Sequence, residues 1–228
     1  MPKVITGIPS ISDEIIKRYQ GLSVATIHEA QGRIGLLSPE IRPIQDGLKV
    51  AGRAVTVFAT PGDNVMIHVA MEQCMPGDVM VMAVNSRSDC GYFGDLLATL
   101  MQAKGVAGLV IDSGVRDLAD LRRMGLPVFS RCISAQGTVK ETLGDVNLPI
   151  VCGGQLINAG DMVVGDDDGV VVVRRDDLAW VADSSDAREE KEAGIREKYG
   201  QGILGLDMNN MRQRLENMGL EYVEYEKE

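Results

Sequence analysis

The sequence predicts an α/β fold with a second layer of strands and a helical segment at its C-terminal end. Two apolar runs, 79–84 and 108–111, contain no alternating polar residues, which indicates strands buried on both faces. A helix-like stretch follows each run. We therefore expect a strand–helix–strand–helix unit whose strands pair in parallel through right-handed crossovers. After Leu126, short strands separated by turns rich in Gly and Asp indicate the second, β-rich layer.

Helical stripes, caps and turn residues predict each element of the first half. An apolar stripe with helical spacing runs through 10–19, where Ser10 and Asp13 fit a capping box. Glycines end three of the helices, and the turn 61–64 can cap another. In order, we expect helices over 10–19 and 23–31, a strand over 49–59, a helix over 65–73, a strand over 79–84, a helix over 96–104, a strand over 108–111 and a helix over 118–124.

The second half is predicted as short strands followed by a long helix. The strands expected are 127–130, 146–151, 162–165 and 170–173, and a final helix is expected over 207–218. Asp176 or Asp177 begins the long helix, which runs to about Tyr199. Its charged part, 186–192, either lies in solvent or packs across a subunit boundary, and we favour the boundary. We divide the chain into a domain over 1–175 and a helical arm over 176–228 that packs on a neighbouring subunit.

The composition is that of a globular protein: 45% of the 228 residues are apolar and 25% are charged. One domain with an appended arm is the simplest organisation at this length. The formal net charge of −10 argues against nucleic-acid binding, because an acidic protein repels phosphate backbones. It also repels anionic substrates at long range, so an anion site needs a local cation, either a bound metal or an arginine.

The four cysteines indicate reduced thiols rather than a zinc or disulfide framework. None of them has CxxC spacing, and the two histidines cannot complete a common zinc set. The N-terminal residues carry no signal-peptide pattern, and no apolar run approaches the length that spans a membrane. We therefore expect a cytoplasmic protein with no membrane association.

Two short motifs, at points where buried strands lead into helices, carry the functional signal. They are 94–97 (Gly-Asp-Leu-Leu) and 112–117 (Asp-Ser-Gly-Val-Arg-Asp). One helix and one strand separate Asp95 from Arg116, so two consecutive strand-to-helix loops meet at one edge of the sheet, where open α/β folds bind ligands. Asp95 alone is equally well interpreted as a plain helix N-cap, and Arg116 with Asp117 as a common helix start.

The chemistry of these residues indicates an anion and a divalent cation held side by side. Amides at a helix N-terminus carry partial positive charge and can hold a small carboxylate. Asp117 offers a carboxylate to a hard cation such as Mg²⁺ or Mn²⁺, and Arg116 offers a planar fork to an oxyanion. The convergence of both loops favours a site over two unrelated helix starts.

Other motifs have simpler interpretations. The run 166–169 lacks the spacing and terminal Glu of an EF-hand and is interpreted as a hairpin turn. His28 and Glu29 resemble the start of HExxH, but Gly32 stands at the position of the second His, so no zinc protease follows. We place His28 near a surface or interface, with a substrate contact as the alternative, and interpret His68 as structural. Glycine-rich phosphate loops and a nucleophile elbow are absent, which disfavours nucleotide-dependent and methyl-transfer enzymes.

Longer runs around the two motifs resemble a known family. They are 25–33, 61–64, 91–99, 111–117, 142–144 with 146–147, 166–170 and 204–208. Together they resemble the RraA-like proteins, and within them the 4-hydroxy-4-methyl-2-oxoglutarate/4-carboxy-4-hydroxy-2-oxoadipate aldolases. The resemblance covers nearly the whole chain, and the C-terminal segment marks the aldolase branch. It implies a layered α/β/β/α sandwich of the swivelling β/β/α type, assembled as a homotrimer or homohexamer with active sites at subunit interfaces.

The resemblance also implies a role for each site residue. Asp117 would bind the metal, Asp95 would hold a water ligand of that metal, and Arg116 would contact the keto oxygen and the enolate. Substrate binding is expected from Gly94, Asp95, Leu96, Leu97 and Arg116, with the amides of Leu96 and Leu97 on the pyruvyl carboxylate. Glu192 would enter from the next subunit and hold another water ligand of the metal, with Glu189 and Glu190 as alternatives for this role.

The implied activity is that of a class II pyruvate aldolase, a lyase that requires Mg²⁺, Mn²⁺ or another divalent cation. It would cleave 4-hydroxy-4-methyl-2-oxoglutarate or 4-carboxy-4-hydroxy-2-oxoadipate, which are small anionic 2-oxo acids, to pyruvate and an oxo acid in aromatic-acid degradation. Oxaloacetate decarboxylation passes through the same enolate and is expected as a side activity. The alternative is an RraA-type regulator that binds a ribonuclease without catalysis, and the C-terminal arm favours the enzyme.

Overall fold

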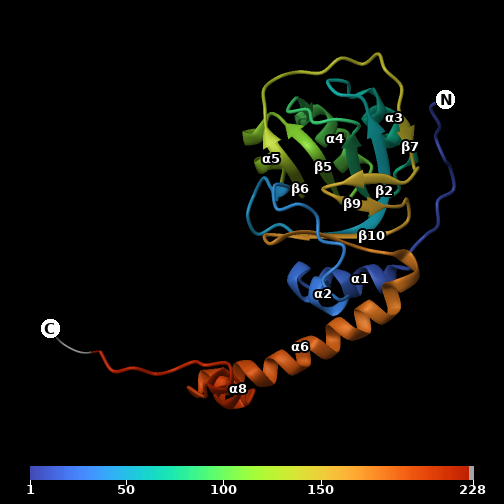
Figure 1. Cartoon of the computed structure of the whole chain (residues 1–228). Coiled ribbons are helices and arrows are strands. Elements are labelled where there is room, and N and C mark those ends of the chain that lie inside the picture. The colour runs from blue at the N-terminus through green and yellow to red at the C-terminus, as the bar shows by residue number, and fades with distance from the viewer. Residues whose placement is uncertain (226–228) are drawn as a thin grey trace. The chain divides into compact units, whose positions relative to one another are not determined.

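The computed structural model describes residues 1–225, and the chain divides into two compact units, Met1–Ser185 and Asp186–Glu228 (Figure 1). Residues 226–228, which the sequence assigned to the arm, lie outside the described residues. The first unit contains the sheet, the cores and the candidate site. The second unit begins inside the long helix α6 (Leu178–Gly200).

The first unit is built on a mixed sheet with the strand order β1-β6-β5-β3-β2-β10-β11. These strands are β1 (Arg42–Pro43), β6 (Val128–Ile133), β5 (Gly108–Val115), β3 (Val79–Val84), β2 (Val50–Ala59), β10 (Met162–Asp166) and β11 (Gly169–Val173). The pairs β2–β3, β3–β5 and β5–β6 are parallel, which confirms the predicted parallel pairing. Two short strands join from the side: β4 (Gly91–Phe93) pairs with β5, and β7 (Asp145–Val146) pairs with β2.

The long strand β2 takes part in both layers of the sheet. The first part of β2, from Val50 to Arg53, pairs antiparallel with β10, and its remainder pairs parallel with β3. The β10–β11 hairpin and a separate hairpin of β8 (Ile150–Cys152) and β9 (Gln155–Ile157) contribute buried residues to a core on one face of the parallel strands. The predicted second β layer is therefore present.

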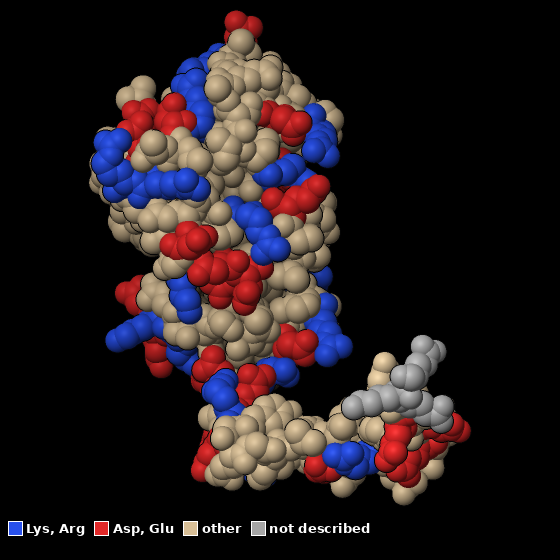
Figure 2. Space-filling view, turned by 90° about the vertical axis from the view of Figure 1, so that its left-hand side faces the viewer, with Lys and Arg blue, Asp and Glu red and all other residues tan. Residues whose placement is uncertain are grey.

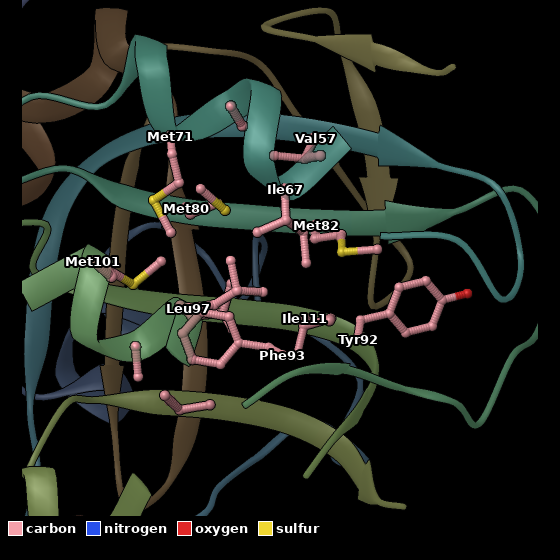
Figure 3. Packing of buried hydrophobic residues seen from close by; sticks show 14 of the residues in the cluster. Val57, Ile67, Met71, Met80, Met82, Tyr92, Phe93, Leu97, Met101 and Ile111 are labelled. Atoms are coloured by element: carbon pink, nitrogen blue, oxygen red, sulfur yellow. The ribbon is translucent and has the colours of Figure 1, made fainter. Parts of the chain in front are cut away.

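Helices complete the layers on both outer sides. Helices α3 (Val65–Gln73), α4 (Asp95–Ala103) and α5 (Leu118–Met124) pack on the free face of the parallel strands. Figure 3 shows this core, with Ile67, Met71, Leu97 and Met101 of the helices directed toward Met80, Met82 and Ile111 of the strands. Helices α1 (Asp13–Gly21) and α2 (Val24–Ala30) and the start of α6 pack on the β10–β11 side. This is the α/β/β/α arrangement.

Several predicted boundaries were wrong for identifiable reasons. Ser12, not Ser10, is the N-cap of α1, and its hydroxyl accepts from the amide of Ile15 at 3.4 Å. The strand expected over 146–151 is split into β7 and β8, and Asn147 between them has a φ of 63°. The helix expected over 207–218 is interrupted at Asn210, where φ is 50°. Such left-handed residues cannot continue a regular strand or helix.

The second unit has helical structure but no buried core. It consists of the rest of α6, then α7 (Gly205–Met208) and α8 (Met211–Asn217). Among residues 186–225, which the structure describes, none is buried. Several large apolar side chains of this unit are more than 40% exposed, namely Tyr199, Ile203, Leu204, Met218, Leu220, Tyr222, Val223 and Tyr225.

Candidate active site

The two predicted loops meet because β4 and β5 run side by side. Gly91 pairs with Gly114 and Phe93 with Val115, and the amide of Arg116 donates to the carbonyl of Phe93 at 2.9 Å. Strand β4 leads into α4 and strand β5 leads into α5, so both helices start at the same sheet edge. The sequence predicted neither β4 nor the extension of β5 beyond Ile111.

The two loops line one pocket of about 130 Å³. Its lining residues are Asn64, His68, Tyr92, Gly94, Asp95, Leu96, Leu97, Arg116, Asp117 and Lys140. The structure therefore brings together the six site residues predicted in the first unit. The volume is below the ~300–1,000 Å³ typical of ligand sites, which suits a small acid.

The remaining predicted site residue, Glu192, belongs to the second unit. There it accepts from Arg188 one turn earlier on α6, with Nε and Oε1 2.8 Å apart. Its entry into a neighbouring subunit's site stays a prediction.

The backbone of Asp117 is in the left-handed region, with φ 56° and ψ 40°, and Asp117 is the N-cap of α5. This conformation is uncommon outside glycine and is best tolerated by Asp and Asn. Its Oδ2 lies 3.4 Å from the amide of Asp95 and 3.5 Å from Nε of Arg116. The carboxylate thus lies between the two loops.

Gly94 leaves the space that the Asp117 carboxylate fills. A Cβ on Gly94 would lie 2.2 Å from Oδ2 of Asp117 and 3.2 Å from Cγ of Arg116. Any larger residue at position 94 would therefore displace the side chain of Asp117, predicted to bind the metal, or that of Arg116, predicted to contact the keto oxygen.

The first turn of α4 differs from the predicted one in a single respect. Gly94 is the N-cap and Asp95 is the first helical residue, so Asp95 does not cap the helix. Instead, its Oδ1 accepts from the neighbouring amide of Leu96 at 2.8 Å. For that amide to bind a ligand carboxylate, the Asp95 side chain must first turn away.

Four further residues line the pocket and were not predicted as site residues, namely Asn64, His68, Tyr92 and Lys140. His68 was interpreted as structural, but its side chain is exposed and faces the pocket. Partial desolvation lowers the pKa of His68, and the positive charge of Lys140 lowers it further. Asn64 is the N-cap of α3 and His68 lies one turn into that helix, so their spacing of four residues could have indicated that they lie close together. Lys140 gives no local signal, since a contact between distant segments positions it.

The donor set fits a hard, partly hydrated cation. Over residues 1–225, no group of three His, Cys, Asp or Glu side chains could hold a metal by itself. Asp117 and Asp95 offer carboxylate oxygens at the edge of an open pocket. Mg²⁺ suits such a site, because it retains several waters and often binds through one or two carboxylates.

The other sequence motifs are structural in this chain. The run 166–169 is the β10–β11 hairpin turn, in which Asp166 accepts from the amides of Val24 and Asp168. A ring nitrogen of His28 lies 3.1 Å from the carbonyl of Ile34. All four cysteines are free. Among the described residues, no helix is long and apolar enough to cross a membrane.

Comparisons with known proteins agree on one family. The model described as RraA-like (Aldolase/RraA) matches residues 8–172. A Halalkalibacterium halodurans protein named "Putative 4-hydroxy-4-methyl-2-oxoglutarate aldolase" is 33% identical over 70% of this chain and 76% of its own length. An uncharacterised protein from Pseudomonas syringae pv. tomato matches with a TM-score of 0.74 at 29% identity, over 86% of this chain and 96% of the other. Streptomyces coelicolor RraAS2, described as an unusual member of the RNase ES inhibitor RraA family, matches with a TM-score of 0.73 at 30% identity, over 82% and 98%.

Proposed function

Because the chain belongs to the RraA-like family, we propose that it is a divalent-metal-dependent class II pyruvate aldolase. The substrates are 4-hydroxy-2-oxo acids such as 4-hydroxy-4-methyl-2-oxoglutarate or 4-carboxy-4-hydroxy-2-oxoadipate, and the products are pyruvate and a second oxo acid. The observation that carries the proposal is the pocket in which the Asp117 carboxylate, the Arg116 guanidinium and the start of α4 converge. The names of the sequence relatives point to the same activity.

In this proposal, the start of α4 binds the C1 carboxylate of the substrate. The Leu96 and Leu97 amides lie at the positive end of the helix. Rotation of Asp95 away from the Leu96 amide would free that donor and leave the Asp95 carboxylate able to accept a proton from water or substrate.

The bond that breaks is C3–C4. The C4 hydroxyl loses its proton, the C3–C4 electron pair passes into pyruvate enolate, and protonation at C3 gives pyruvate. The Arg116 guanidinium donates to the keto oxygen, where negative charge develops. The backbone of Arg116 is held by its amide bond to the carbonyl of Phe93. Asp117 would hold Mg²⁺ or Mn²⁺, which when bound withdraws electron density from the keto group. Oxaloacetate decarboxylation yields the same enolate, so we propose it as a side activity.

A coupled assay of pyruvate release tests the proposal. The wild-type protein with Mg²⁺ should release pyruvate from 4-hydroxy-4-methyl-2-oxoglutarate and from oxaloacetate above the metal-only background, and EDTA should abolish this. Arg116→Ala should lower kcat about 100- to 1,000-fold, as is typical when one donor to a developing oxyanion is lost.

Arg123→Ala is the matched control, because Arg123 is an exposed arginine on α5 whose partner, Asp120, lies on the same helix. It should leave the rate nearly unchanged. Near-normal turnover by Arg116→Ala would contradict the assigned role of Arg116. Absence of metal-dependent pyruvate release by the wild type would contradict the aldolase itself.

We also propose that the second unit packs on a neighbouring subunit of a homotrimer or homohexamer and supplies Glu192 to its site. The support is that residues 186–225 bury none of their side chains and expose many apolar ones. Isolated short helices with no buried face are marginal in water. Packing against a partner surface would bury their apolar side chains and stabilise them.

A second candidate is a protein-binding regulator without catalysis. The observation that favours it is the similarity to RraAS2, which is described as belonging to a family of RNase inhibitors. Figure 2 shows acidic and basic side chains mixed over one face of the first unit, a surface that could meet a protein partner. The same pyruvate assay separates the candidates, because a regulator of this kind releases no pyruvate.

A further inference from the structure

A second pocket, of about 230 Å³, lies at the edge of the sheet and takes no part in the proposed chemistry. Strand β6, helix α5 and the segment that contains β1 supply its walls. Four charged side chains line it, those of Glu40, Arg42, Arg122 and Arg131. It shares no lining residue with the candidate active site, so its character calls for a separate explanation.

The pocket lies beside a part of β6 that has a neighbouring strand on one side only. Strand β1 pairs with Phe129 and Ser130, whereas β6 continues to Ile133. Within residues 1–225, the stretch 131–133 pairs with β5 on its inner side and with no strand on its outer side. An open edge of this kind can accept an extended segment as an added strand.

Two arginines flank this open edge from opposite faces of the sheet. Arg122 lies on α5, and its Nε donates to the carbonyl of Ile44 at 2.7 Å. Arg42 lies on β1, and its Nη1 donates to the carbonyl of Asp168, in the β10–β11 turn, at 3.0 Å. Helix α5 and the β10–β11 hairpin cover opposite faces of the parallel strands. One guanidinium is therefore available on each side of the edge.

The charge at this pocket is positive. Arg42 and Arg122 are exposed, and in the part of the chain that the structure describes neither has a carboxylate at ion-pair distance. Arg131 pairs with the carboxylates of Glu40 and Asp112. Three arginines thus face two carboxylates, in a chain whose net charge is −10. The guanidinium groups without a carboxylate favour an acidic partner.

The C-terminal tail of the chain, which we define as residues 221–225, has the complementary character. Its sequence is Glu-Tyr-Val-Glu-Tyr, and the three residues that follow add two more glutamates and one lysine. Tyr222, Val223 and Tyr225 are at least 70% exposed, and 221–225 belong to no helix or strand. Tyr and Val favour strands. The tail is therefore an acidic segment with strand-forming residues and, in the described chain, no partner strand.

We propose that the tail of one chain binds this pocket of a second copy as an added strand along β6. Residues three apart in a strand point to opposite faces, so Glu221 and Glu224 can each meet one of the two arginines, Arg42 and Arg122. The apolar side chains of the tail then cover Ile133, which is 49% exposed. This rests on the proposal that the second unit packs on a neighbouring subunit, and it names the surface that receives the end of that unit.

Disulfide cross-linking to a native cysteine tests the contact. Cys132 lines the pocket and is half-buried, whereas the other three cysteines are buried. Tyr222, Val223 and Tyr225 are each replaced by Cys, and the full chain is oxidised with copper phenanthroline in air at about pH 8.5, because burial raises the pKa of the Cys132 thiol. At least one variant should give a disulfide-linked dimer on a non-reducing gel, since paired strands bring Cα atoms within disulfide range. Adding Cys132→Ser should remove this band, which separates it from a link between two tails.

Charge reversal tests the ion pairs. Arg42→Glu with Arg122→Glu should slow the cross-link about tenfold, as expected when two exposed ion pairs are lost and replaced by repulsion. Glu221→Arg with Glu224→Arg in the same chain should restore the rate. Arg123→Glu is the matched control, because Arg123 is an exposed arginine on α5 that does not line the pocket, and it should leave the rate unchanged.

Met218→Cys is the control for position, because Met218 is 74% exposed and lies just before the tail. It should give no dimer band through Cys132. Absence of a band from all three tail variants, in a full chain that light scattering shows to be oligomeric, would overturn this contact and leave the second unit's role between subunits in place. A disulfide within one chain, found by mass spectrometry without a dimer band, would also overturn the contact. A full chain that is a monomer in light scattering would contradict that role and this contact together.

Discussion

At the scale of single residues, the site depends on Gly94, which has no side chain to fill the space that the Asp117 carboxylate occupies. Gly94 has an extended backbone, with φ −147° and ψ −167°, so backbone strain does not explain its presence. What excludes other residues is the Asp117 carboxylate, whose Oδ2 would lie 2.2 Å from a Cβ at position 94. The atom in the way is the end of a flexible side chain, so the chain can fold with a larger residue and the site alone would change.

Gly94→Ala should therefore reduce activity while preserving the fold. We expect a loss of about 100-fold in pyruvate release, because displacement of a site group by about 1 Å can cost that much, and a higher Mg²⁺ concentration for half-maximal activity. The melting temperature should stay within a few degrees of wild type. Gly137→Ala is a close control, since a Cβ there would make only an ordinary contact of 3.5 Å with Nη1 of Arg116. Equal activity of the two variants would refute the role of Gly94.

Local rules account for the site residues that the sequence did predict. Residues at the ends of parallel strands meet at one sheet edge, and this alone grouped Asp95 with Arg116 and Asp117. Lys140 could not be found this way, because its position depends on the bridge between Asp63 and Val139, which are distant in sequence. The left-handed backbone of Asp117, with a φ of 56°, was also not predicted, since Asp at a helix start ordinarily indicates a regular N-cap or first turn.

At the scale of elements, the turn before α3 connects parts of the chain that the sequence keeps apart. Oδ1 of Asp63 accepts from the amide of Val65 at 2.9 Å, and Oδ2 accepts from the amides of Glu141 and Thr142, which follow Lys140. Burial acts to raise the pKa of Asp63, but these backbone bonds outweigh it and lower the pKa below 3.8. The ionised carboxylate therefore stabilises the fold above that pH, and the stabilisation is lost as pH falls through the lowered pKa.

Asp63→Asn should destabilise the protein in a pH-dependent way. Asparagine supplies one oxygen acceptor but turns its NH₂ group toward amide donors, so we expect a decrease of about 1–3 kcal/mol in the free energy of unfolding at pH 7. In urea titrations the difference from wild type should shrink below pH 3.8. A difference that stays constant from pH 7 to pH 3 would show that the charge of Asp63 is unimportant. Asp46→Asn, at a residue outside this turn, is the control.

Elements with a strong apolar pattern were predictable, and the exceptions have local causes. Strand β3 and helices α3 and α5 match their predicted ranges. Strand β4 has three residues and was missed, because so short a segment carries no periodicity. The break between α7 and α8 follows from the left-handed backbone of Asn210, which sequence patterns do not reveal. The parallel pairing of β3 with β5 was predicted, but the register of each pair needed the structure.

At the scale of the whole molecule, the first unit carries three buried clusters, whereas the described part of the second unit has no buried residue. The start of α6 belongs to the first unit, where Val181 and Ala182 are fully buried. A chain ending at Ser185 therefore retains every cluster. If the arm joins subunits, light scattering should give this shorter chain fewer subunits per particle than the full chain. An unchanged number of subunits would contradict that role.

The sharpest test of a shared site mixes two inactive proteins. Glu192→Gln should lose about 100-fold of activity, as expected when a group that orients a proton-transferring water is removed. Glu189→Gln and Glu190→Gln should remain active. If Arg116 and Glu192 of one site come from different subunits, unfolding and refolding an equal mixture of Arg116→Ala and Glu192→Gln restores activity. Random assembly then unites an intact Arg116 with an intact Glu192 in about a quarter of the sites. Sites built within a single chain would regain nothing, because each chain in the mixture lacks one of the two residues. Recovery near that fraction, absent when either variant is refolded alone, therefore requires that Glu192 serve a neighbour.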